Sequence, residues 1–193
     1  MPFRILCVCT GNICRSPTAE RLLRRELAQR LGAAAANFEV ASAGTGAHVG
    51  EPIQEHAAAL LRRAGADTSA FAARLLTEQQ LDQANLVLAA TRRHRAECAT
   101  LLPTVVPRLF TLREFARLAN AALPELTGIE PVEERARKLV VAAAGRRGVA
   151  RAPSPSDDDV RDPYGGPASG YVEPFEATAA ACADVAAALS GTA

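Results

Sequence analysis

The sequence contains no tryptophan and one methionine, and aromatic residues make up only 4% of its 193 residues. It also lacks an excess of either charge, because 22 basic and 21 acidic side chains leave a net charge of +1. Such a balance creates no large field that would attract nucleic acid or a membrane surface. No run approaches the roughly 20 apolar residues of a membrane span, and the first residues lack the apolar core of a signal peptide. We therefore expect a cytoplasmic protein that binds neither nucleic acid nor membrane and acts through a local site.

Cysteine is present, but its pattern excludes two classes of protein. The five cysteines form an odd set without a C-x-x-C pair, which argues against a secreted disulfide framework and against a zinc site. Hydrophobic residues make up 49% of the chain, enough for a substantial core, and the length suits a single domain over residues 1–193. We expect a monomer whose cysteines are either buried or reactive thiols.

Short apolar runs alternate with amphipathic stretches along most of the chain. This alternation predicts an α/β fold, in which a parallel sheet is covered by helices on both faces. Ser16 followed by Pro17 has the form of a helix cap and a first helical residue. The predicted strands are 3–9, 38–45, 84–91 and 106–112, and the predicted helices are 17–32, 52–65, 113–123 and 171–190, with a short helix after the third strand.

Residues 123–160 fit this alternation poorly, and we interpret them as an insertion. One helix is predicted over 132–148, followed by a stretch rich in Pro, Ser and Asp. Such an insertion is either a peripheral helix on a flexible arm, or a lid or partner-binding element.

The first strand runs into a loop that combines the features of an oxyanion site. A loop between a buried strand and a helix start points its backbone N–H groups inward, and the helix adds positive potential. Cys9 lies at the base, where this field favours its thiolate, and Arg15 offers a planar fork for two phosphate oxygens. Gly11 permits close backbone approach and Asn12 tolerates left-handed dihedrals. The residues expected to surround the substrate are Thr10, Gly11, Asn12, Ile13, Cys14 and Ser16.

Attack of a thiolate on a phosphate ester also needs a proton donor for the leaving oxygen. Asp162, in the turn that begins with Pro163, is the candidate for this role. Tyr164 follows it and is expected to form a wall of the cleft against an aromatic leaving group.

Four segments together resemble the low-molecular-weight protein tyrosine phosphatase family. They are VCTGNICRSPTAE (8–20), SAGTGAHVGEP (42–52), LVLAATRRHR (86–95) and DPYGGP (162–167). The resemblance implies a three-layer fold with a central four-stranded parallel sheet and a phosphate-binding loop after the first strand. It also implies hydrolysis of phosphotyrosine on proteins, or of related aryl phosphates, through a cysteinyl-phosphate intermediate without metal or cofactor.

By position, the resemblance gives each site residue a role. Cys9 is the nucleophile, Arg15 the phosphate clamp, and Asp162 the general acid and then base. Ser16 stabilises the thiolate and Asn12 fixes the loop.

The chain departs from the family pattern in the wall of the cleft. Gly165 stands where a second aromatic residue is common, and Ala47 and His48 stand where an aromatic residue often precedes Val-Gly. The wall is therefore thinner, with His48 a candidate contact to the cleft. The basic run 92–95 is either a solvated helix face, or it brings Arg92 or Arg93 near an anionic substrate.

The remaining cysteines leave alternatives open. Cys14 matches a family position that forms a reversible disulfide with the nucleophile, with inert packing as the alternative. Cys7 and Cys182 are expected to be small buried hydrophobes. Thioredoxin-coupled arsenate reductases share the fold and the loop and need two further cysteines. Cys98 matches one of these, but Thr91 occupies the place of the other. A phosphate-binding module without turnover is a third, less favoured class, because nucleophile, arginine and acid are all present.

Overall fold

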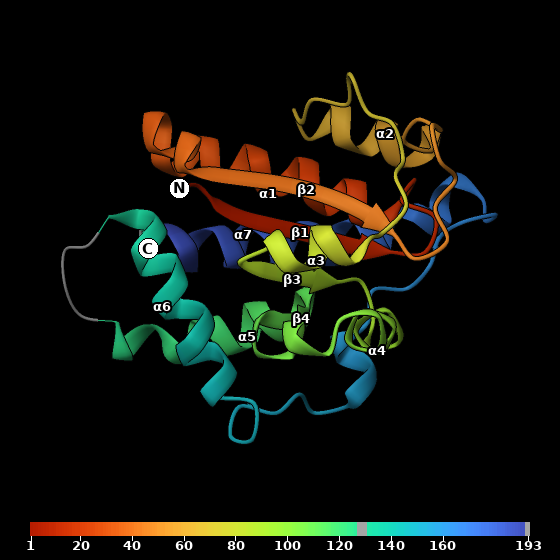
Figure 1. Cartoon of the computed structure of the whole chain (residues 1–193). Coiled ribbons are helices and arrows are strands. Elements are labelled where there is room, and N and C mark those ends of the chain that lie inside the picture. The colour runs from red at the N-terminus through yellow and green to blue at the C-terminus, as the bar shows by residue number, and fades with distance from the viewer. Residues whose placement is uncertain (127–130, 192–193) are drawn as a thin grey trace.

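A four-stranded parallel sheet forms the centre of the molecule, as a computed structural model of residues 1–126 and 131–191 shows (Figure 1). The strand order is β2-β1-β3-β4, so the first strand of the chain lies inside the sheet. This confirms the predicted fold class. The strands are β1 (Phe3–Cys9), β2 (Phe38–Gly44), β3 (Leu86–Ala89) and β4 (Leu109–Thr111).

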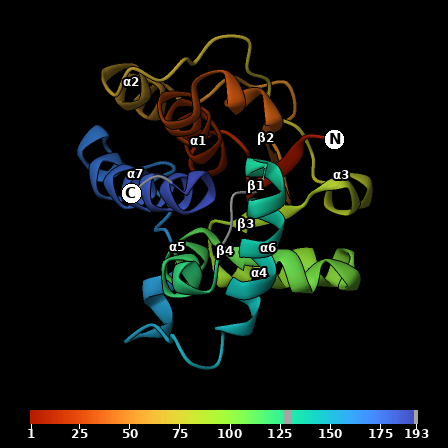
Figure 2. The same cartoon turned by 90° about the vertical axis from the view of Figure 1, so that its left-hand side faces the viewer.

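The two faces of β1 enter two different cores because successive side chains of a strand point to opposite faces. Ile5 and Cys7 join the larger core, and Leu6 and Val8 join the smaller one. Figure 2 looks along the strands and shows these helical layers on either side of the sheet. The larger core is formed with α1 (Arg15–Leu31), α2 (Glu55–Arg63), α5 (Leu112–Ala122), α6 (Val132–Gly145) and α7 (Val172–Ser190), and the smaller with α3 (Glu78–Gln83) and α4 (Arg92–Leu101).

Several element boundaries differ from the sequence-based expectation. The first half of the fourth predicted strand is wrong, since residues Pro103–Arg108 form a 3-10 helix. Pro107 lies within it and has no N–H to donate to a sheet ladder. The predicted cap at Ser16 is also wrong, because α1 begins at Arg15 with Cys14 in the cap position. The short helix α3 was not predicted from the sequence.

The helix of the predicted insertion is part of the core. Four residues at helical spacing, Ala136, Leu139, Val140 and Ala143, are buried in the larger core. The expectation of a peripheral helix is therefore wrong for α6; residues 127–130 lie outside the described residues. Figure 2 shows α6 in front of the amino ends of the strands, and it contacts the 3-10 helix that precedes β4. It covers the end of the sheet opposite to Cys9.

Within the described ranges, no helix combines the length and the apolar character needed to cross a membrane.

Candidate active site

The loop of residues 9–15 joins the central strand to α1 at the carboxyl end of the sheet. Cys9 is the last residue of β1 and Arg15 is the first residue of α1. Both are buried, with 2% and 8% of their surface exposed. The sequence-based expectation of a strand, a loop and a helix around these two residues is confirmed in this arrangement.

In the 9–15 loop the carbonyl oxygens accept hydrogen bonds from other segments of the chain, whereas the N–H groups of residues 10–14 have no acceptor among the described residues. The amides of residues 10–14 donate no hydrogen bond to any part of the chain that the structure describes. Their N–H groups are therefore free to bind an oxyanion beside the start of α1. The carbonyls of Cys9, Thr10, Gly11 and Ile13 accept from the backbone N–H groups of Thr45, Gly46, His48 and Gln54, at 2.8 to 3.0 Å.

Gly44, at the end of β2, allows the close contact that makes this pattern possible. A Cβ at this position would lie 2.3 Å from the carbonyl oxygen of Thr10. Asn12, on the opposite side of the contact, has a positive φ of 53°. Its Oδ1 accepts the backbone N–H of Arg74 at 2.9 Å, which fixes the loop from a second segment. Sequence reasoning missed Gly44, although a glycine at a strand end is a signal of close backbone approach.

A chain of buried polar groups leads to the sulfur of Cys9. The Nδ2 of Asn12 donates to Ser16 Oγ at 2.9 Å and to Ser42 Oγ at 2.8 Å. Ser42 in turn donates to Glu20 Oε2 at 2.6 Å. Ser16 Oγ lies 3.0 Å from Cys9 Sγ and 3.3 Å from the carbonyl oxygen of Ala43, so its one proton has two acceptors in reach. Ser42 and Glu20 were missed from the sequence because nothing local marks them.

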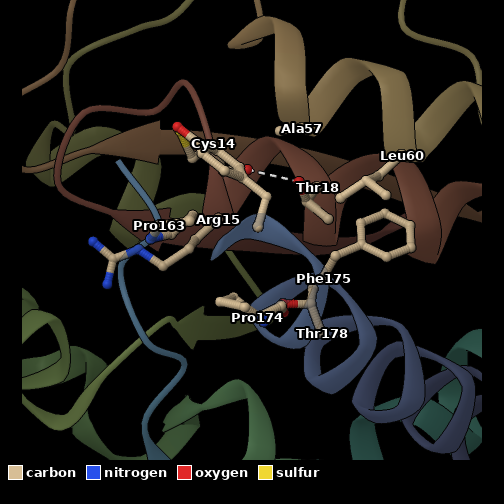
Figure 3. A pocket seen from close by; sticks show the side chains of 10 residues that line it. Cys14, Arg15, Thr18, Ala57, Leu60, Pro163, Pro174, Phe175 and Thr178 are labelled. Atoms are coloured by element: carbon tan, nitrogen blue, oxygen red, sulfur yellow. Dashed lines mark hydrogen bonds between the residues drawn. The ribbon is translucent and has the colours of Figure 1, made fainter. Parts of the chain in front are cut away.

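Asp162 lies beside Arg15, although 147 positions separate them. The Nη2 of Arg15 is 2.5 Å from Asp162 Oδ2, and its Nη1 donates to the carbonyl of Val160 at 3.3 Å. The carboxyl group is half exposed, and its Oδ1 accepts the N–H of Tyr164. In Figure 3 the guanidinium of Arg15 points away from Leu60 and Phe175, which line an apolar hollow behind the loop. The predicted nucleophile, clamp and acid thus share one site.

The rim beside the loop carries two rings. Those of His48 and Tyr164 lie 5.7 Å apart between centroids, and Tyr164 is 57% exposed. Together with Ile13 and Glu51 they line a hollow next to the 9–15 loop. His48 thus contacts Tyr164; that the two rings form the wall of the substrate cleft stays a prediction.

His94 is a further residue of the site that sequence reasoning did not select. It is 2% exposed, and its two ring nitrogens bind Thr10 Oγ1 at 2.8 Å and Thr91 Oγ1 at 2.7 Å. Burial, followed by the nearby charge of Arg15, lowers the pKa of His94 to about 4. A neutral ring thus links the 9–15 loop to the start of α4.

The two arginines that precede His94 have different surroundings. Arg92 forms an ion pair with Asp159 at 3.0 Å. Arg93 reaches Thr10 Oγ1 at 3.4 Å and also pairs with Glu97 at 3.1 Å, with most of its side chain exposed. Of the two, Arg93 is the one that lies at the 9–15 loop.

The cysteines other than Cys9 are all buried free thiols. Burial, and then the proximity of Cys9, raises the pKa of Cys14 to about 12, so this thiol is protonated at neutral pH. The disulfide between Cys9 and Cys14 stays a prediction. Burial also raises the pKa of Cys98, in the smaller core, to about 12. Cys7 and Cys182 are buried in the larger core, as expected.

Comparison with known proteins gives the class to which this fold and site belong. The family described as "Low molecular weight phosphotyrosine protein phosphatase" matches residues 4–139. The chain belongs to this family of cysteine-dependent phosphatases.

The relatives of this chain are named for two different substrates. The chain is 31% identical over 171 residues to a protein-arginine-phosphatase of Geobacillus stearothermophilus, covering 89% of this chain and 85% of the relative. It is 42% identical over 116 residues to low molecular weight protein-tyrosine phosphatase A of Mycobacterium tuberculosis, covering 59% and 68%.

Solved structures agree with the family. The YwlE arginine phosphatase from G. stearothermophilus matches with a TM-score of 0.66 and 28% identity, covering 96% of this chain and 91% of that one. A low molecular weight protein tyrosine phosphatase from T. tengcongensis matches with a TM-score of 0.66 and 29% identity, covering 94% and 96%.

Proposed function

We propose that this chain hydrolyses phosphotyrosine in proteins, with Cys9 as the nucleophile. The observation that carries the proposal is the run of unbound N–H groups in residues 10–14, between Cys9 and Arg15, with Asp162 paired to Arg15. A tetrahedral oxyanion suits such a loop because N–H dipoles and a helix start both favour negative charge.

The reaction proceeds in two displacements. The thiolate of Cys9 attacks phosphorus, the bond to the tyrosyl oxygen breaks, and the carboxyl proton of Asp162 passes to that oxygen. Asp162, now a carboxylate, takes a proton from the water that attacks the cysteinyl phosphate, which releases inorganic phosphate and restores the thiolate. Arg15, paired with Asp162 in the structure, turns its fork to two phosphate oxygens, where it stabilises the charge of the transition state.

The rim supports an aromatic leaving group. Ile13 and the rings of His48 and Tyr164 offer apolar and aromatic surface to a flat ring. Phosphoarginine is the second candidate substrate, because a relative that covers most of this chain is named for it. Its guanidinium would need hydrogen-bond acceptors, and the hollow at the rim is lined by two exposed carboxylates, Glu51 and Glu55.

Arsenate reduction is disfavoured by the position of its required thiol. Cys98 is fully buried on α4 in the smaller core, and burial keeps it protonated. Thr91 caps α4 by accepting the N–H of His94, so it has a structural role of its own.

The test is a panel of phosphotyrosine, phosphoarginine and phosphoserine peptides, assayed in EDTA beside arsenate reduction. We expect turnover of phosphotyrosine in EDTA, at least about tenfold above phosphoarginine in kcat/KM, because the rim carboxylates Glu51 and Glu55 are exposed to water and discriminate weakly for a guanidinium. Cys9→Ser is the control, since it should abolish turnover and still bind vanadate through the loop amides. Preference for phosphoarginine would overturn the substrate, and activity that requires an added metal would overturn the mechanism.

A further inference from the structure

Asp159, three residues before Asp162, has an unusual set of contacts. Its Oδ1 accepts the backbone N–H of Arg92, the first residue of α4, at 2.7 Å. The side chain of the same arginine donates to it as well, from Nε at 3.3 Å to both oxygens and from Nη2 at 3.0 Å. One carboxylate thus holds both the main chain and the side chain of Arg92.

The backbone on either side of this contact is bound too. The N–H of Val160 donates to the carbonyl of Ala90, just after β3, at 2.8 Å. The carbonyl of Asp159 accepts from Arg113 of α5 at 3.3 Å. Residues 159 and 160 are therefore tied to the turn between β3 and α4 and to α5.

The charge of Asp159 is kept by these contacts. Burial by itself would raise the pKa of Asp159, but the hydrogen bonds from Arg92 outweigh it and lower the pKa. The same hydrogen bond raises the pKa of Arg92. Both groups remain ionised throughout the neutral range.

Asp162 has far weaker support of its own. Its carboxyl group is half exposed, and its partners are Arg15 and, over a local turn, the N–H of Tyr164 at 3.2 Å. In the reaction proposed above, Arg15 turns to the phosphate and gives up this contact. The hydrogen bond from Tyr164 moves with the same turn, so what then holds this turn near the leaving oxygen is the anchored backbone that precedes it.

We propose that Asp159 and Arg92 form a clamp that positions Asp162 over the 9–15 loop while Arg15 is engaged with phosphate. The proposal rests on the proposed role of Asp162 as the general acid. Asp159 touches neither substrate nor Cys9 in this mechanism and acts as a positioning residue.

The test compares Asp159→Ala with Asp158→Ala. Asp158→Ala is the matched control because it removes the same charge from the same segment. Asp158 pairs with Arg117 of α5 and not with Arg92. The readout is the rate of leaving-group release in the first turnover, since the second step is common to all substrates. With phenyl phosphate, whose leaving oxygen needs a proton, Asp159→Ala should be slower by about tenfold, as expected for a displaced acid. With p-nitrophenyl phosphate, whose leaving group needs none, the loss should stay within about twofold.

Two further variants separate positioning from folding. Asp159→Asn retains an oxygen that accepts from Arg92, so it should recover part of the rate with phenyl phosphate. Combining Asp159→Ala with Asp162→Asn should cause no loss beyond that of Asp162→Asn, because both changes remove the same function. Equal losses on both substrates, or a loss with Asp158→Ala as large as with Asp159→Ala, would overturn the clamp.

Asp162→Asn alone distinguishes this proposal from the one on which it rests. If that variant lowers the rates with both substrates equally, the general acid has been assigned to the wrong residue. If it shows the expected dependence on the leaving group and Asp159→Ala does not, the acid stands and the clamp is wrong.

Discussion

The missing side chain of Gly44 lets the end of β2 lie against the 9–15 loop. The contact turns the carbonyl of Thr10 outward to the N–H of Gly46, and the amides of residues 10–14 remain for the oxyanion. The shape of the loop therefore depends on the absence of a side chain at residue 44 as well as on the charged groups beside it. In the proposed reaction Cys9 and Arg15 supply the chemistry, while Gly44 and Asn12 hold the backbone of the loop in its shape.

Replacing Gly44 by alanine should distort the loop, because its Cβ would lie 2.3 Å from a backbone oxygen that no rotamer change can move away. We expect a loss of about 1–3 kcal/mol in the free energy of unfolding, typical of overpacking, and a drop in kcat/KM. Gly46→Ala is the control, since its Cβ would meet a methyl group of Thr10 at 3.8 Å, an ordinary contact. Chemical denaturation and steady-state kinetics measure both; equal behaviour of the two variants would contradict this account of Gly44.

His94 should make the stability of the protein depend on pH. Its folded-state pKa of about 4 lies below the usual value of 6.5, so between these values the unfolded chain binds a proton that the folded chain excludes. The stabilisation is therefore complete above about pH 6.5 and is lost as the pH falls toward 4. From pH 7 to pH 5 the loss amounts to about 2 kcal/mol.

The measurement is urea unfolding of the wild type and His94→Gln at both pH values. The wild type should be the more stable at pH 7. The difference between the two proteins in free energy of unfolding should be smaller by about 2 kcal/mol at pH 5. His48→Gln, at the exposed rim, serves as the control and should keep the wild-type dependence. A gap that does not change with pH would mean that His94 is not kept neutral by its surroundings.

At the scale of elements, α6 and the 9–15 loop lie at opposite ends of the sheet. The helix packs its apolar stripe over the amino ends of the strands, where Arg137 also donates to the carbonyl of Met1. The loop lies at the carboxyl ends, where parallel strands of an open α/β sheet commonly bind ligands. We therefore expect α6 to contribute to stability and not to the chemical steps.

Leu139→Ala tests this division, because Leu139 is completely buried on α6. The cavity should lower the free energy of unfolding by about 2–5 kcal/mol. kcat/KM for phosphotyrosine should stay within about twofold of the wild type under conditions in which the variant is folded. Val141→Ala, on the exposed side of the same helix, should change stability by less than about 0.5 kcal/mol. A selective loss of activity in Leu139→Ala would show that α6 communicates with the site.

At the scale of the whole molecule, the chain returns to the site from its far end. After α6, residues 146–160 run along α5 and are bound to it through Arg117 and Asp158. They end at the turn between β3 and α4, where Asp159 accepts the N–H of Arg92. Figure 1 shows the ribbon of this segment beside α4. From there the chain continues to Asp162, which lies against Arg15.

The sequence by itself determined the fold class, the 9–15 loop and the residues with chemical roles in the proposal. Strand, loop and helix follow one another within thirty positions there, and local spacing is enough to place Cys9 against Arg15. Asp162 was selected as the proton donor in an Asp-Pro turn, and the resemblance to the family supported that choice. The tertiary structure alone decided the roles of Gly44 and His94, the packing of α6 and the pairing of Asp159 with Arg92. Each depends on partners tens of residues away, and neither a turn residue nor the apolar face of a helix specifies in the sequence which distant segment it will contact.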